Sequence, residues 1–181
     1  MNIQDSLALR AAQTAEDYIA VYAGDPKPHR IVIGAAIAGS DRSTPSVLIV
    51  QRSAHERSYP NEWEIPGGHV DPGEYILDTV AREVLEETSL VVTRVVNEFV
   101  GFDYWTTKYE EDESNNTDDR VVSICTHQLN FCVEVGDASD IKLNPDEHQN
   151  HAWCTKDTLE QFKMTPTMKQ VILDALCALD Y

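Results

Sequence analysis

The chain has 181 residues, of which 42% are apolar and 25% charged, and its formal net charge is −17. This length and composition are typical of a globular protein with a core of its own. No apolar run approaches the roughly 18 residues that a membrane-spanning helix needs, and the acidic balance disfavours a nucleic-acid polymer. We therefore expect neither a membrane nor a nucleic-acid partner, although a bound cation would still allow a small phosphorylated ligand.

The compartment can be predicted from the N-terminus and the cysteines. The first stretch, MNIQDSLALRAAQTAEDY, contains an early acid and lacks the apolar run of a secretory signal. The four cysteines are scattered without a CxxC pair: Cys125, Cys132, Cys154 and Cys177. We expect a cytoplasmic protein with buried free thiols, and a zinc site or a disulfide is the alternative.

The N-terminal part predicts a helix over residues 4–22. Thr14 and Asp17 are spaced to form a capping box inside this helix. The helix ends at GDPKPH, residues 24–29, because proline and glycine interrupt helices. Residues 1–28 are therefore predicted to be a helical extension.

The middle of the chain predicts two pairs of strands. Residues 31–38 and 46–52 are apolar and flank a turn, which is typical of a β-hairpin. Residues 90–105 and 121–135 are rich in β-branched and aromatic side chains and predict a second pair. The acidic segment 109–120 between them predicts a solvated hairpin tip.

The C-terminal part predicts a short strand followed by two helices. The first helix begins near Thr155, and the second occupies residues 164–181, with Thr165 as N-cap and Pro166 at the first helical position. Neither a repeat nor a linker divides the sequence. Residues 1–181 are therefore predicted to form one α+β domain, with a mixed sheet flanked by helices.

Residues 73–88 predict an amphipathic helix with crowded acids. Glu83, Glu86 and Glu87 share an arc of about 100° at the border of its apolar stripe. They repel one another by roughly 0.2–0.5 kcal/mol per pair, and the helix C-terminus disfavours anions. Such a conflict often marks function, and convergent carboxylates suit a hard cation such as Mg²⁺. The alternative is an ordinary charged helix face.

The turn before this helix favours the functional interpretation. PGGHVDPGE supplies glycines that let the backbone approach a ligand closely. From Gly68 the sequence reads Gly, five residues, Glu74, seven residues, and then REVLEETSL. This resembles the Nudix box, which ends in Arg-Glu-apolar-any-Glu-Glu-any-Gly-apolar. Every fixed position from Gly68 to Leu90 matches except Ser89, and the preceding WEIPGG is also similar to the family.

The resemblance implies a Nudix-type α/β/α sandwich that hydrolyses a nucleoside diphosphate linked to another moiety, with Mg²⁺ or Mn²⁺ as cofactor. It implies four metal-binding groups: the carboxylates of Glu86, Glu87 and Glu83, and the carbonyl of Gly67. Glu83 is alternatively the general base. Arg82 belongs to the catalytic group and forms an ion pair with Glu74, and Gly68 helps to orient the loop.

Residues outside the box complete the predicted site. Some family members use a later glutamate a few residues before a Trp, and Glu147 in DEHQNHAW matches it as ligand or base. His148 and His151 are alternatives in the same segment. Three residues are candidate substrate contacts: Arg52, Arg57 and Trp63. Four aromatic residues either stack on a base or pack in the core or in a homodimer: Phe99, Phe102, Tyr104 and Trp105.

Two functional hypotheses remain open. The first is an active hydrolase with a small phosphorylated substrate, and the presence of every box glutamate favours it. The second is a catalytically weak or inactive Nudix-like domain that binds or senses a nucleotide. Ser89 replaces a helix-ending glycine. A serine in the left-handed conformation costs on the order of 1 kcal/mol, unless the helix ends with other dihedral angles, so we expect an active enzyme with a mild penalty.

Overall fold

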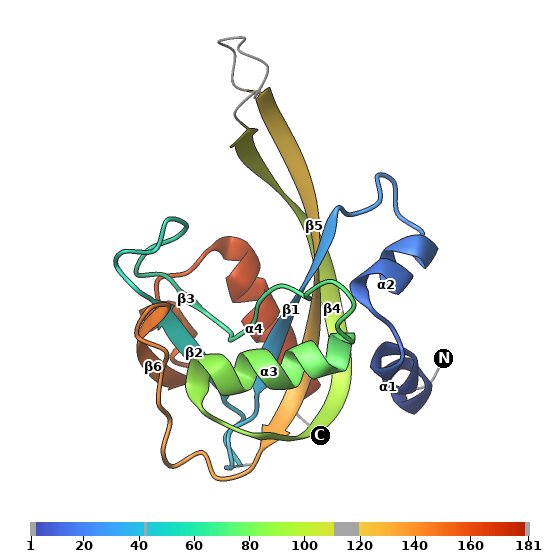
Figure 1. Ribbon diagram of the computed structural model, residues 1–181. Helices are drawn as coiled ribbons and strands as arrows, with labels where there is room; N and C mark the ends of the chain where they lie inside the picture. The colour runs from blue at the N-terminus through green and yellow to red at the C-terminus, as the bar shows by residue number, and fades with distance from the viewer. Residues whose placement is uncertain (1–2, 42, 111–119, 180–181) are drawn as a thin grey trace.

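The computed structural model describes residues 3–41, 43–110 and 120–179, and their strands form two three-stranded sheets (Figure 1). In chain order the strands are β1 Arg30–Ile37, β2 Val47–Arg52, β3 Trp63–Glu64, β4 Val92–Glu110, β5 Arg120–Val135 and β6 His148–Cys154. The first sheet has the order β1-β5-β4, with β1 parallel and β4 antiparallel to β5. The second has the order β3-β2-β6 and is antiparallel.

Helices pack against both faces of the sheets. Successive residues of a strand point to opposite faces, so Phe131 of β5 packs in one core with Val80 of α3 Ile76–Thr88. Its neighbour Cys132 packs in a second core with Ile172 of α4 Pro166–Ala178. The predicted α+β class and α/β/α layering are confirmed, with the strands divided between two sheets.

The predicted hairpin of residues 31–38 and 46–52 is wrong, although both strands exist. After a single bridge between Ala38 and Val47 the two strands separate, and β1 pairs along its whole length with β5. The apolar run from Ile31 to Ile37 is buried throughout. Such a run is typical of a strand covered on both faces, which a parallel partner and two helical layers provide.

The predicted helix over residues 4–22 is divided in two. α1 covers Ile3–Ala11 and α2 covers Ala15–Val21. The predicted capping box is present and begins the second helix: the amide of Asp17 donates to Thr14 Oγ1, and the amide of Thr14 donates to the Asp17 carboxylate. Because a capping box satisfies the free amides of a helix N-terminus, it starts a new helix here.

Of the two predicted C-terminal helices, the first is much shorter than expected and the second is present. The helix predicted near Thr155 is a single 3-10 turn, η1 Leu159–Gln161. The next prediction is confirmed, because the amide of Met168 donates to Thr165 Oγ1 at the start of α4. Among the helices in the described ranges, none is long and apolar enough to cross a bilayer.

The predicted pairing of the long strands β4 and β5 is confirmed, and the ribbon extends beyond the end of β1 (Figure 1). The acidic tip predicted over residues 109–120 lies mostly outside the described residues. All four cysteines are free thiols. Three are buried as expected, but Cys177 is exposed, because it lies on the outer face of α4.

Candidate active site

One cleft of about 530 Å³ contains most of the predicted site residues. Its walls come from β1, the loop after β3, α3, and the start of β6. The predicted residues that line it are Arg52, Gly67, Gly68, Arg82, Glu83, Glu86, Glu87 and Glu147. Glu74 does not line the cleft, but it accepts hydrogen bonds from Arg82, which does.

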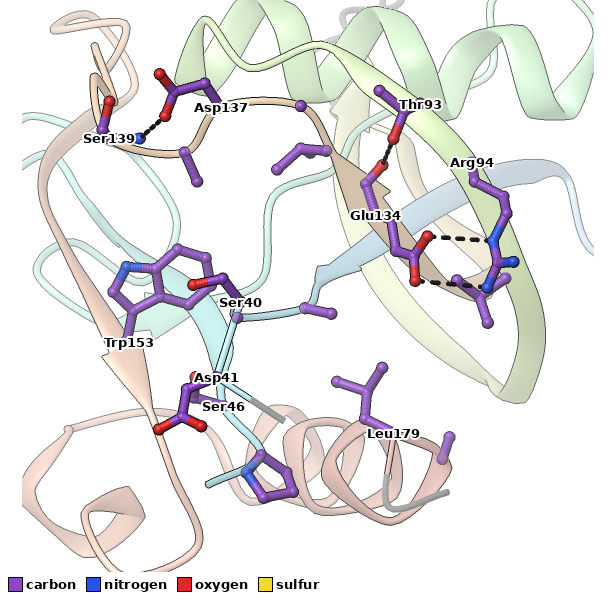
Figure 2. Close-up of a pocket in the computed structure, with 18 residues that line it drawn as sticks. Ser40, Asp41, Ser46, Thr93, Arg94, Glu134, Asp137, Ser139, Trp153 and Leu179 are labelled. Carbon is purple, nitrogen blue, oxygen red and sulfur yellow. Dashed lines mark hydrogen bonds and ion pairs between the residues drawn. The ribbon is translucent and has the colours of Figure 1, made fainter. Parts of the chain in front are cut away.

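A second cavity, of about 700 Å³, lies between the β1–β2 turn, the start of β4 and the end of α4 (Figure 2). Trp153 forms one side of it, and Arg94 pairs with Glu134 across from this ring, with a 3.2 Å Nε–Oε2 distance. Its other charged groups are Asp41 and Asp137. None of the predicted site residues lines this cavity, so we assign the candidate active site to the smaller cleft.

Helix α3 presents two of its glutamates inward and one outward. Glu83 and Glu87 are one helical turn apart and are 9% and 4% exposed. Burial raises the pKa of Glu87 well above its usual value, and the nearby carboxylates of Glu64 and Glu83 add to the effect. Burial also raises the pKa of Glu83, against the opposing influence of Arg82. The third carboxylate, that of Glu86, is exposed.

The glycine turn brings the loop against these carboxylates. The amide of Gly67 donates a hydrogen bond of 3.1 Å to Glu87 Oε2. A Cβ at Gly67 would collide with the carbonyl oxygen of Ile33, and a Cβ at Gly68 would collide with the Glu83 carboxylate. The two glycines therefore allow the loop to pass between β1 and α3. Contact of the Gly67 carbonyl with a metal stays a prediction.

Arg82 joins the loop to the helix through three carboxylates. It donates to both oxygens of Glu74 at 2.8 Å, to Glu83 Oε1 at 2.8 Å and to Glu86 Oε2 at 3.1 Å. The hydrogen bonds from Arg82 to Glu74 lower the pKa of Glu74 to about 2. The ion pair that the sequence predicted between Arg82 and Glu74 is present, and it fixes the orientation of Glu83.

The opposite wall contains residues that the sequence did not identify. Glu64 accepts a 2.6 Å hydrogen bond from Arg52, whose other terminal nitrogen donates to Glu56. Both glutamates line the cleft. The signal for Glu64 was its position in a strand next to Trp63, because neighbouring strand residues face opposite sides. Trp63 indeed points away and packs edge-on against Phe162, with ring centroids 4.9 Å apart.

Several predicted site residues lie outside the cleft or at its rim. Arg57 is exposed in the loop before β3 and does not line the cleft. Glu147 is exposed at its rim, whereas His148 is buried and lines it. Ligand atoms of Glu87, Glu147 and His148 lie within 4.8 Å of one another. His151 is exposed on β6.

The four aromatic residues divide between cleft and core. Tyr104 lines the cleft, and burial raises its pKa. Phe99 and Phe102 pack against the core on the α4 side. Trp105 is exposed on the ribbon beside His29. Stacking on a substrate base therefore remains a prediction for Tyr104 alone.

The donor set of the cleft fits a divalent cation. Seven acidic side chains line it but only two arginines, and both arginines are already paired with carboxylates. A polyanionic ligand would therefore meet a negative surface unless a cation is bound. Carboxylate oxygens are the ligands that Mg²⁺ and Mn²⁺ favour.

Comparison with known proteins agrees with this geometry. The family model "NUDIX domain" matches residues 28–175. The chain therefore belongs to the Nudix family.

Curated relatives share parts of the sequence. An m7GpppN-mRNA hydrolase NUDT17 from Xenopus laevis is 33% identical over 112 residues, which are 62% of this chain and 37% of that protein. A nucleoside triphosphatase NudI from Escherichia coli is 27% identical over 117 residues, which are 63% of this chain and 76% of the other. The matched segments span only 15% to 37% of the length of the NUDT17 relatives.

Solved structures share the fold. A Caenorhabditis elegans Ap4A hydrolase matches with a TM-score of 0.55 and 21% identity, covering 83% of this chain and 97% of the other. The Nudix domain of Shewanella oneidensis NrtR, solved with ADP ribose, matches with a TM-score of 0.57 and 20% identity, covering 92% and 99%. At these identities the likeness concerns the fold alone.

Proposed function

We propose that this protein is a divalent-metal-dependent pyrophosphohydrolase that cleaves the diphosphate linkage of a nucleoside diphosphate joined to another moiety. The observation that carries the proposal is the cleft in which Glu83 and Glu87 lie against a glycine turn and Glu147 lies at the rim. Family membership supports the reaction class. Glu86 and Glu87, with Glu147 from the opposite side, would hold Mg²⁺ or Mn²⁺.

Each side chain then has a distinct role. A bound divalent cation would neutralise the phosphate oxygens and make an attacking water more acidic. Glu83 is the general base in this proposal, because burial raises its pKa and Arg82 holds one of its oxygens at 2.8 Å. The water oxygen attacks phosphorus, its proton passes to Glu83, and the bond from phosphorus to the bridging oxygen breaks. Glu147 is the alternative base.

A substrate panel tests the proposal. Pure protein with Mg²⁺ or Mn²⁺ is incubated with nucleotide sugars, dinucleotide polyphosphates, ADP-ribose, NADH, coenzyme A, nucleoside triphosphates and oxidised dNTPs, and phosphatase-coupled phosphate release is followed. A cap dinucleotide and a capped RNA are included because of the relatives' printed activities. We expect turnover of at least one small compound, with the cap dinucleotide preferred over the RNA, because the charge of −17 repels a polyanion. Binding without turnover anywhere would favour a regulatory domain.

A variant pair tests the metal site. Glu87→Gln should lower kcat/KM on the order of 100-fold, because it removes a charged group that acts on the transition state. Its melting temperature should not fall, because the native carboxylate is buried at a cost. Asp78→Asn is the control, since Asp78 is an exposed acid in the first turn of the same helix. Unchanged activity in Glu87→Gln would contradict the assignment.

A further inference from the structure

His148 is a buried histidine beside the carboxylates of the cleft. Its side chain is only 2% exposed. Its Nε2 lies 3.5 Å from Glu64 Oε1, which is too long for a strong hydrogen bond. Its Nδ1 is buried and has no hydrogen-bond partner in the described part of the chain. Because a buried polar atom without a hydrogen-bond partner is unfavourable, this imidazole needs a physical explanation.

The surroundings of His148 supply the other ligands of a cation site. One of its ring nitrogens lies within 4.8 Å of carboxylate oxygens from both Glu87 and Glu147, which are themselves this close. Ligands about 2.0–2.3 Å from one ion are separated by up to about 4.5 Å. The three groups can therefore converge on one ion with small side-chain movements.

Hydrogen bonds of the backbone fix the segments that carry these side chains. The amide of His148 donates to the carbonyl of Asn144 at 2.9 Å, and the carbonyl of Glu147 accepts from the amide of Ser53 at 2.8 Å. The carboxylate of Glu87, on α3, accepts a hydrogen bond from the amide of Gly67. The segment at the start of β6 and helix α3 therefore bring their metal-binding groups to a common point.

A purely electrostatic role for His148 explains less. As a protonated cation it would face Glu64, but Arg52 already makes a 2.6 Å ion pair with that carboxylate. A charged imidazole would also need partners for both nitrogens, and Nδ1 has none in the described residues. A neutral imidazole can offer the lone pair of one ring nitrogen to a cation while the other nitrogen carries the proton.

We propose that His148 is a direct nitrogen ligand of the divalent cation, together with Glu87 and Glu147, and that it gives the site a preference for Mn²⁺ over Mg²⁺. This inference rests on the proposed metal-dependent function. Mg²⁺ strongly favours oxygen ligands and retains its waters, whereas first-row transition ions accept imidazole. Loss of this nitrogen should therefore weaken Mn²⁺ binding much more than Mg²⁺ binding.

Pulsed electron paramagnetic resonance with Mn²⁺ tests the ligand directly. We expect the echo of the Mn²⁺-loaded protein to be modulated by a coordinated ¹⁴N nucleus. The modulation should disappear in His148→Gln and persist in His151→Gln, a matched control because His151 is exposed three residues further along β6. In calorimetric titrations, His148→Gln should weaken Mn²⁺ binding on the order of tenfold, a scale seen when groups that support a metal are removed, and leave Mg²⁺ binding within about threefold.

Labelling the native protein with ¹⁵N-histidine keeps the test independent of whether the variant folds. A coordinated imidazole would then replace the ¹⁴N modulation with a ¹⁵N coupling. One outcome would overturn the inference alone: the native protein binds Mn²⁺, Glu87→Gln abolishes that binding, and no histidine coupling is found. His148 is then not a ligand, while the proposed function stands. If the native protein binds neither Mn²⁺ nor Mg²⁺, the proposed function itself fails, and the inference with it.

Discussion

Ser89 occupies the helix end at which the Nudix box has glycine. Its φ of 60° and ψ of 14° are left-handed, and a residue with a Cβ is strained there by on the order of 1 kcal/mol. Its hydroxyl donates to the carbonyl of Lys142 at 3.1 Å, which offsets part of this strain. Of the two helix endings that the sequence left open, the left-handed one is present.

Ser89→Gly should therefore raise the free energy of unfolding by less than about 1 kcal/mol, because the strain is relieved while an exposed hydrogen bond is lost. Urea denaturation at pH 7 measures the change. Ser89→Ala is the control and should destabilise, since it keeps the Cβ and removes the hydroxyl. We expect kcat/KM of Ser89→Gly to match the native value. A variant that is both less stable and less active would disprove the strain argument.

At the residue scale, the sequence predicted the groups that lie close together in the chain. The box residues share one loop and one helix, so their spacing alone places them on a common surface. Glu64 and His148 are 84 residues apart in the chain, and only the pairing of β2 with both β3 and β6 brings them together. Local patterns do not predict this pairing of strands, so the sequence alone did not place Glu64 beside His148.

At the element scale, strands were predicted more reliably than their partners. A hydrophobic pattern indicates which faces of a strand are buried, but the identity of the neighbouring strand depends on the whole topology. This explains why β1 and β2 were found and yet wrongly paired with each other. In contrast, β4 and β5 are consecutive along the described sheet and do form the expected antiparallel pair.

The contact between the glycine loop and α3 has a pH dependence of its own. Arg82 lowers the pKa of Glu74 to about 2, from a usual value of 4.5, so the folded state binds fewer protons at this group than the unfolded state. The stabilisation is therefore complete above about pH 5 and is lost as the pH falls towards about 2.

Glu74→Gln should lower the free energy of unfolding by about 2 kcal/mol at neutral pH, since it removes a charged hydrogen-bond acceptor of Arg82. The difference between native protein and variant should shrink steadily from pH 5 to pH 3, because the Glu74 carboxylate of the unfolded native chain takes up a proton in this range while that of the folded chain stays ionised. Urea denaturation across this range measures both quantities. A difference that stays constant from pH 7 to pH 3 would show that the ion pair does not stabilise this contact.

At the scale of the whole molecule, the net charge of −17 has the same sign as any diphosphate substrate. The field around the protein therefore opposes the encounter, and salt screens it within about 8–10 Å at 0.1–0.15 M ionic strength. We expect kcat/KM for an anionic substrate to rise several-fold between about 0.01 M and 0.15 M KCl at constant free metal. An enzyme whose positive surface attracts its anionic substrate would show the opposite trend. The kcat at saturating substrate should change little, because it does not depend on encounter. A kcat/KM that falls with salt would mean that the cation in the cleft, and not the acidic surface, dominates the approach of the substrate.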